Sequence, residues 1–144
     1  MKTMRVITKE ETTHIVRFDQ EEDVLIQLSV YCSSESIPSA TFTALGACQN
    51  ITIAYYDLPK KKYLDKTYKG DLEIISIIGN ISQKDEKYII HAHGSFADSD
   101  YNVFGGHVKE LIVSATCEVH LTVLHKKLVR RYDEKTGLNL LQKT

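Results

Sequence analysis

The chain has few of the features that would place it in a specialised class of protein. Its three cysteines, Cys32, Cys48 and Cys117, are odd in number, widely spaced and without a CxxC pair. This usage argues against a disulfide scaffold or a cysteine zinc site and favours a reducing compartment. No segment approaches the roughly 20 apolar residues of a membrane span, and residues 1–5 lead into a charged stretch rather than a secretion signal. We expect a cytoplasmic protein with no membrane partner.

Neither sign of charge dominates the sequence. The 18 basic and 19 acidic side chains leave a formal net charge of -1, which provides no general attraction to a phosphate backbone. Basic residues cluster only at positions 60–62 and at Lys126, Lys127, Arg130 and Arg131, without interleaved aromatic residues. Such clusters are usually solvated surface, so DNA binding would need one of them to act as a local patch.

The apolar pattern predicts one helix near the N-terminus. Residues 12–18 alternate between polar and apolar and are rich in β-branched types, which is typical of a strand. Asp19 is a suitable N-cap, acidic residues follow at positions 21–23, and apolar residues then repeat at helical spacing. We therefore expect a helix over residues 20–34 that ends before Pro38.

The remainder of the chain has the pattern of strands. Residues 40–47, 50–56, 72–81, 87–96 and 107–125 carry it, separated by Pro59, Gly70, a turn at 83–85 and a loop from 94 to 106. Residues 131–138 indicate a turn or short hairpin. At 144 residues, this order predicts a single α+β domain with an antiparallel sheet and one main helix. Its core would span about residues 13–124, followed by a C-terminal extension from 125 to 144.

The stretch from 111 to 124 is long for one strand, so we expect a bend or bulge within it. Its alternation predicts an apolar face and a polar face that is exposed or lines a site. The apolar set is Val113, Ala115, Cys117, Val119, Leu121 and Val123, and the polar set is Ser114, Thr116, Glu118, His120 and Thr122.

Three histidines between positions 91 and 107 are the best chemical clue in the sequence. On a strand, His91 and His93 point the same way, with Cα atoms roughly 6.6 Å apart. The segment from 94 to 104 is rich in turn formers, so the chain can double back and bring His107 near the pair. Three neutral imidazoles with one open position can hold a zinc ion that still binds water or a ligand. Alternatively, these histidines are partly buried polar residues bonded to the backbone.

Several segments, in order and spacing, resemble the plants and prokaryotes conserved (PPC) domain over residues 13–124. They are Arg17, Gly46-Ala47, the GDLEIISIIG run from Gly70, His91-Ala92-His93, Gly105-Gly106-His107 and the TCEV run from Thr116. The resemblance implies an antiparallel sheet, one main helix and assembly into a homotrimer.

In plants, this domain follows an AT-hook in nuclear DNA-binding proteins, and a GRFEIL segment mediates contact with partners. Here that segment reads GDLEII from Gly70, so Asp71 stands where the family has arginine, and the RGRP core of an AT-hook is absent. The chain therefore lacks the minor-groove reader, and DNA binding is implied by the resemblance alone.

Family members without an AT-hook resemble compact trimers whose histidine cluster holds a metal, commonly taken as zinc. The resemblance then implies His91, His93 and His107 as ligands. Gly105 and Gly106, which have no Cβ, would allow the backbone conformation that returns His107 to the strand pair.

Three charged residues are candidates for supporting roles. Glu73 is expected on the same strand face as Ile75 and Ile77, an unusual place for a carboxylate unless it is paired. We expect an Arg17–Glu73 pair at a subunit interface, with a substrate-binding pair as the alternative. Glu118 would accept a hydrogen bond from one of the histidines and fix its tautomer.

Three functions are consistent with this sequence. The first is a trimeric DNA-binding, transcription-associated module. The second is a metal-dependent protein that binds a small molecule, or a hydrolytic enzyme in which zinc lowers the pKa of bound water to about 7. The third is a structural trimer in which the histidines only pack.

Overall fold

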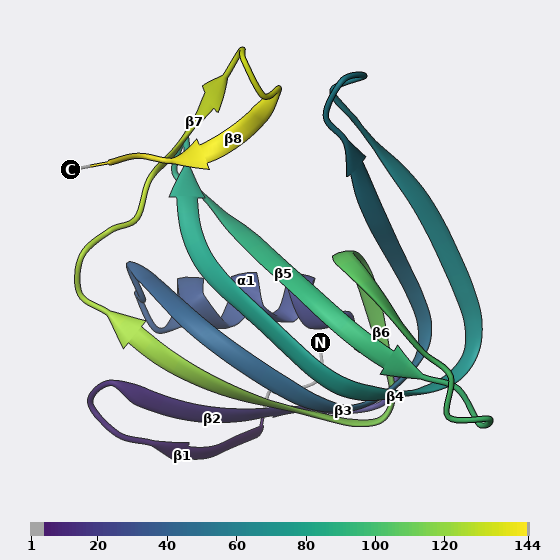
Figure 1. The fold of residues 1–144 in the computed structure, drawn as a ribbon. Coiled ribbons are helices and arrows are strands. Elements are labelled where there is room, and N and C mark those ends of the chain that lie inside the picture. The colour runs from purple at the N-terminus through teal and green to yellow at the C-terminus, as the bar shows by residue number, and fades with distance from the viewer. Residues whose placement is uncertain (1–4, 144) are drawn as a thin grey trace.

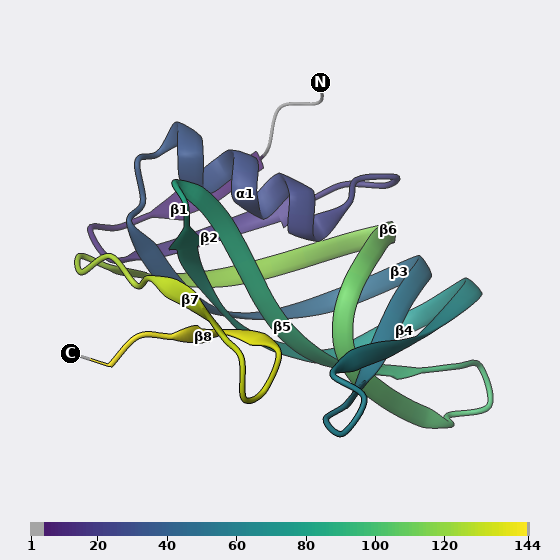
Figure 2. The same cartoon turned by 90° about the horizontal axis from the view of Figure 1, so that it is seen from above.

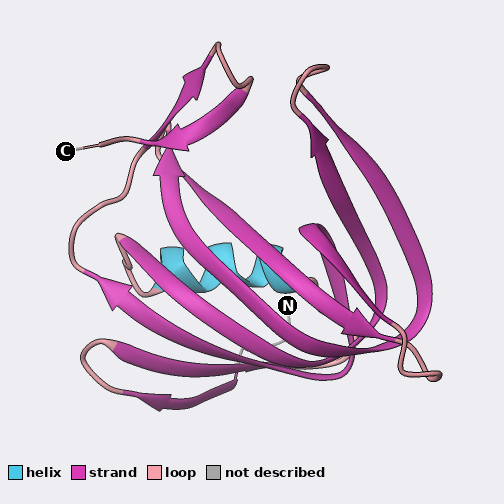
Figure 3. Cartoon of the chain, in the orientation of Figure 1, coloured by secondary structure: helices cyan, strands magenta, loops and turns pink. Residues whose placement is uncertain are grey.

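A single helix packs against a strongly curved antiparallel sheet in the computed structural model, which describes residues 5–143 (Figure 1). Residues 1–4, which belong to the segment where we expect no secretion signal, lie outside the described residues. The elements are β1 (Arg5–Lys9), β2 (Thr13–Phe18), α1 (Val24–Ser34), β3 (Ser39–Asp57), β4 (Lys62–Lys84), β5 (Lys87–Ala97), β6 (Val103–Leu124), β7 (Arg130–Asp133) and β8 (Leu138–Leu141). Strands make up most of the chain, which confirms the predicted α+β class (Figure 3).

The main sheet partly closes on itself because β6 is long enough to pair with three strands. Its strand order is β1-β2-β6-β3-β4-β5, and the start of β6 also pairs with β5. The strands β3, β4, β5 and β6 therefore form a closed ring at one end, while the other half of β6 lies between β2 and β3. Strands β7 and β8 form a separate hairpin on the side of the sheet away from α1 (Figure 2).

The hydrophobic core lies between α1 and the face of the sheet that it covers. Val16 and Phe18 of β2 and Leu28 of α1 are fully buried there. The helix begins at Val24, where the Asp23 side chain accepts hydrogen bonds from the backbone N–H groups of Leu25 and Ile26. No helix in the described part of the chain is long and apolar enough to span a membrane.

The predicted helix start at residue 20 is wrong because the preceding segment pairs with β6 instead. The N–H of Glu21 donates to the carbonyl of Val113, and the N–H of Val113 donates to the carbonyl of Glu22. Glu21 has a φ of 68°, a left-handed conformation that a helix cannot contain.

Two of the breaks that the sequence predicts, at residues 48–49 and at Gly70, are bulges within continuous strands, whereas the chain turns near Pro59 and at residues 85–86. β3 runs continuously past position 48, and β4 continues through Gly70, which has a φ of 111°. The predicted irregularity in residues 111–124 is confirmed: Gly46 pairs with Cys117 but Cys48 pairs with Val113, so β6 has two extra residues there. At Gly46, a Cβ would lie 2.0 Å from the carbonyl oxygen of Thr116, so only glycine fits this bulge.

The predicted division of β6 into two faces is largely confirmed. Cys117, Val119 and Leu121 are fully buried, whereas His120 and Thr122 lie on the opposite, exposed face. Ala115 is exposed because it falls in the bulge, where the alternation of side chains is interrupted. The uncovered face is therefore polar along this part of β6, and it continues across β3, β4 and β5 to the three histidines.

Candidate metal centre

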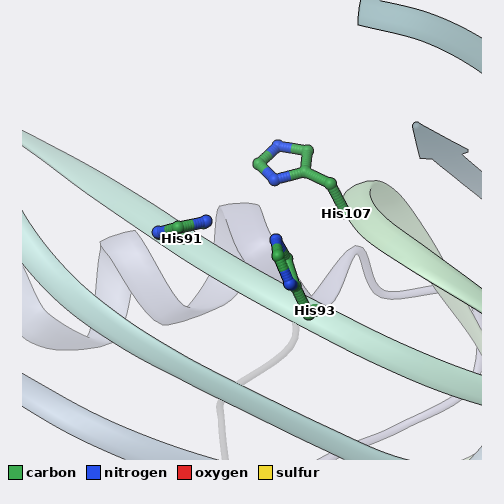
Figure 4. A group of neighbouring side chains, drawn as sticks. All are labelled: His91, His93 and His107. Atoms are coloured by element: carbon green, nitrogen blue, oxygen red, sulfur yellow. The ribbon is translucent and has the colours of Figure 1, made fainter. Parts of the chain in front are cut away.

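His91, His93 and His107 come together on the uncovered face, where β5 and β6 pair. His93 lies directly opposite His107 in the antiparallel ladder, and His91 is two residues along β5 on the same face. One nitrogen of each ring points toward a common point (Figure 4). The ring centroids are 5.1 Å (His91–His93), 5.4 Å (His91–His107) and 5.6 Å (His93–His107) apart. Strand register thus assembles the cluster.

The connection between the histidines is shorter than the sequence suggested. The predicted loop from 94 to 106 is mostly strand, because β5 continues to Ala97 and β6 begins at Val103. Only residues 98–102 form the turn, where the Asp98 carboxylate accepts hydrogen bonds from the N–H groups of Asp100 and Asn102. His107 therefore returns to the pair along a paired strand rather than on a flexible loop.

Gly105 and Gly106 serve close approach rather than unusual backbone angles, which corrects our expectation. Neither has the positive φ that Gly46, Gly70 and Gly137 show. A Cβ on Gly105 would lie 2.3 Å from the carbonyl oxygen of Gly94 on β5, and one on Gly106 would lie 3.0 Å from that of Ala54 on β3. The two glycines let three strands pack tightly beside the histidines.

The surroundings of the histidines favour their neutral form. Burial, with smaller contributions from the neighbouring His91 and His93, lowers the pKa of His107 to about 4. Burial also lowers the pKa of His91, with Arg130 and His93 adding to the effect. Neutral imidazoles have a free lone pair, which a metal needs, and these two remain neutral at pH 7.

The donor set fits a zinc ion. The nearest ligand atoms of the three histidines all lie within 4.8 Å of one another. Two nitrogens bound to one tetrahedral zinc are roughly 3.3 Å apart, so small side-chain rotations would bring all three nitrogens to a metal. Three protein ligands would leave one tetrahedral position for another molecule.

Arg130 contacts the cluster through His91 and is absent from the site residues that the sequence predicts. Its position predicts membership of a basic surface cluster, but the residue is only 7% exposed. Its guanidinium donates to the Ser82 hydroxyl at 2.7 Å and to the Asn80 side-chain oxygen at 2.8 Å, and Nη2 lies 3.4 Å from Nδ1 of His91. Arg130 is 23 residues beyond His107, and nothing in their spacing indicates contact.

A cleft of about 640 Å³ opens beside the histidines, between the β3–β4 hairpin, β5 and the β7–β8 hairpin. Tyr63 of β4 stacks on the ring of His107, with 4.7 Å between centroids. The hydroxyl of Tyr56 donates to the carbonyl of Thr136, and Lys61 donates to the carbonyl of Glu134. The tips of the two hairpins therefore meet over the cleft. Its lining includes Ile90, His91, His93, His107, Arg130, Leu138 and Leu140.

The other predicted charged residues lie away from the cluster. Arg17 lies opposite Glu118 in the β2–β6 ladder, and its Nε donates to Asp19 at 3.1 Å. Among the described residues, neither a hydrogen bond from a histidine to Glu118 nor an Arg17–Glu73 ion pair is present. Whether Arg17 and Glu73 of different subunits pair stays a prediction.

Glu73 has a different environment from the one that strict alternation predicted. It is exposed, as is Ile75, whereas Ile77 is 2% exposed. A bulge between Ile74 and Ser76 shifts the register with β5, so residues on either side of it alternate out of phase. The carboxylate of Glu73 is therefore solvated and needs no buried partner.

A family model described as the Plants and Prokaryotes Conserved (PCC) domain matches residues 6–125. A structure from Ralstonia eutropha JMP134, named "Putative DNA-binding protein", is 32% identical, covers 95% of each chain and has a TM-score of 0.89. A plant- and prokaryote-conserved (PPC) protein from Pyrococcus horikoshii is 31% identical, covers 100% of this chain and 97% of its own, and has a TM-score of 0.85.

A third similar structure, from Archaeoglobus fulgidus, is called a metal-containing protein. It is 31% identical, covers 99% of this chain and 100% of its own, and has a TM-score of 0.84. No curated protein sequence matches the chain.

Proposed function

We propose that this chain, which belongs to the Plants and Prokaryotes Conserved (PCC) domain family, is a metal-binding protein that uses its metal on a small molecule. The metal would be zinc, held by His91, His93 and His107. The observation that carries the proposal is the convergence of three imidazole nitrogens within 4.8 Å at the wall of a cleft. The metal-containing relative from Archaeoglobus fulgidus supports it.

A zinc ion in this position would supply a Lewis acid and a water of lowered pKa. The protein would supply the rest: two neutral ligands at pH 7 in His91 and His107, a ring stacked on His107, and a cleft large enough for a small organic molecule. The same parts serve either a binding protein or a hydrolytic enzyme, so the proposal covers both.

Elemental analysis of protein purified without chelator tests the proposal. We expect about one zinc per chain and its loss in His91→Ala and in His107→Ala. The matched control is His125→Ala, because His125 is exposed and outside the cluster. Wild-type protein that binds no divalent metal, even after incubation with zinc, cobalt or manganese, would refute a metal site.

DNA binding is the second candidate function, favoured by the name of the Ralstonia relative. Exposed Lys126 and Lys127 would supply the phosphate contacts, together with Lys60–Lys62 of neighbouring subunits. Gel-shift titration at low salt should then show binding that weakens steeply with added salt and in the Lys126→Gln/Lys127→Gln variant. Absence of a shift at low salt would remove this candidate and its role in transcription.

A homotrimer is the proposed assembly, and its support lies on the uncovered face of the sheet. Leu45 (49% exposed), Ile75 (52%) and Ile78 (67%) are apolar side chains left in solvent by the single chain. A second copy would cover them. Light scattering after size exclusion should give three times the chain mass, and Ile78→Asp should lower the measured mass toward that of one chain.

The cytoplasm is our proposed compartment, supported by three buried free cysteines.

A further inference from the structure

Arg130 is a buried cation whose hydrogen-bond partners are all neutral. Besides Ser82, Asn80 and His91, it donates to the backbone carbonyl of Asn139 at 2.9 Å. Within residues 5–143, no ion pair joins a carboxylate to this guanidinium. A buried charge without a counter-charge weakens a fold, so such a group is usually kept for a purpose.

Metal binding at His91 changes what Arg130 can donate to. Nη2 of Arg130 lies 3.4 Å from Nδ1 of His91, which can accept only through the lone pair of that nitrogen. If the metal binds Nδ1, the lone pair is used. If it binds Nε2, the neutral ring carries its proton on Nδ1. Either way the imidazole stops accepting, and an N–H of Arg130 is left without a partner beside the metal.

The cleft is suited to a molecule that would supply the missing acceptor. His91, His93, His107 and Arg130 all line it, so the metal and the guanidinium would face the same space. Its other walls include the apolar side chains of Ile90 and Leu138, together with the Tyr63 ring. A planar guanidinium matches the two oxygens of a carboxylate or a phosphonate.

We infer that the cleft binds a small organic anion, whose oxygens interact with Arg130 and the metal and whose apolar body lies against the cleft wall. Binding of metal and anion is cooperative, because the metal frees an N–H of the guanidinium and the anion interacts with both cationic groups, the metal and Arg130. This inference rests on the proposed metal site. It adds the chemical class of the ligand and the residue that selects it.

Calorimetric titration with benzoate and phenylphosphonate, with benzamide as the neutral control, tests this assignment. Zinc-loaded protein should bind both anions about tenfold or more tightly than metal-free protein, and should bind benzamide weakly in both states. By reciprocity, saturating benzoate should tighten zinc binding by the same factor. The relative affinity of benzoate and phenylphosphonate shows whether the site prefers a carboxylate or a phosphate-like group.

Because a metal attracts anions by itself, variants of Arg130 are needed to separate its contribution to anion binding from that of the metal. Arg130→Gln should retain one zinc per chain and lose benzoate affinity by about tenfold or more, and Arg130→Lys should recover part of it. Arg131→Gln is the matched control, because Arg131 is the exposed neighbour, and its affinity should stay within about twofold of wild type. If Arg130→Gln does not fold, Arg130→Lys and the metal-free comparison carry the test.

The outcomes distinguish the two proposals. If zinc binds but benzoate affinity is the same in wild type and Arg130→Gln, the anion inference is overturned and the metal site stands. If Arg130→Gln changes the oligomeric state at unchanged benzoate affinity, Arg130 is an interface residue and the inference is again overturned. If no metal binds, both proposals fall.

Discussion

The histidines on the two faces of the main sheet differ in their hydrogen-bond partners. On the face covered by α1, His14 is 4% exposed, and its Nδ1 is bonded to the Tyr31 hydroxyl at 2.8 Å. On the uncovered face, His91, His93 and His107 meet without a carboxylate among them, beside a buried guanidinium with neutral partners. On the covered face, His14 and Tyr31 satisfy each other by a hydrogen bond within the chain. On the uncovered face, the three histidines and Arg130 could still bind a metal and an anion.

This contrast separates structural residues from functional ones by chemistry rather than by residue type. A buried polar group that serves stability is satisfied locally, because an unsatisfied one weakens the fold. Groups that bind a metal or an anion keep their capacity free in the isolated chain. Substitutions on the covered face should therefore change stability alone, and those on the uncovered face should change binding.

The largest expected effect is on the covered face. Phe18 is 0% exposed, so Phe18→Ala should lower the free energy of unfolding by about 3–5 kcal/mol, measured by urea denaturation. Zinc stoichiometry of the folded fraction should not change. Ile26→Ala is the control: Ile26 lies on the same helix at 61% exposure and should change stability by about 0.5 kcal/mol or less. Loss of zinc in folded Phe18→Ala protein would break the division between the faces.

Gly105 lies where the two strands of the proposed metal site meet, so its substitution should affect both stability and zinc binding. In Gly105→Ala, the new Cβ meets the Gly94 carbonyl and forces β5 and β6 apart beside His93 and His107. We expect a loss of about 2 kcal/mol of stability and weaker zinc binding, although no ligand is changed. Ser95→Ala, directly opposite in the ladder, is the control and should leave zinc affinity unchanged. Equal zinc affinity in Gly105→Ala and wild type would contradict the close-approach role.

Removing one hydroxyl tests the covered histidine. Tyr31→Phe leaves the buried Nδ1 of His14 without a partner and should lower stability by about 1–3 kcal/mol. Zinc and benzoate binding should match wild type. Tyr55→Phe provides the control, since Tyr55 is 72% exposed. A loss of metal affinity in Tyr31→Phe would show that the two faces are coupled.

The smallest expected effect is the pH dependence of stability in the metal-free protein. The pKa of His107 is lowered to about 4, below its usual value of 6.5, so the unfolded chain binds more protons than the folded one between these values. Stability should therefore be full above about pH 6.5 and fall as the pH drops toward 4, by roughly 1 kcal/mol at this partly exposed site. His107→Gln should flatten the curve. An unchanged slope would assign the effect to His14 or His91, whose pKa values burial also lowers.

Local patterns predicted much of the fold because they act over a few residues. Alternation in β6 correctly assigned Val119 and His120 to opposite faces, and the spacing of His91 and His93 placed them together. The errors arose where tertiary contacts decide the conformation. Pairing of Glu21 and Glu22 with Val113 delays the helix, and the bulge after Ile74 puts Glu73 and Ile77 on opposite faces.

The site residues that the sequence predicted are the three histidines, which lie on the paired strands β5 and β6. His107 could be anticipated because a turn after His93 brings the next strand back along the first. Arg130 and Tyr63 could not, because they reach the cluster from hairpins whose positions depend on the closed ring and on the contact of their tips. Nothing in their sequence neighbourhoods marks them. Burial of an arginine is visible only once the sheet is folded.

The short turn from 98 to 102 makes the candidate metal centre accessible to protein engineering. Because the ladder between β5 and β6 fixes the partnership of His93 and His107, extra residues at the tip would leave the histidines in register. Tyr101 at this tip is 89% exposed. A fluorescent label or a small reporter domain inserted there would sit one short hairpin from the centre, and could report its occupancy without altering a ligand.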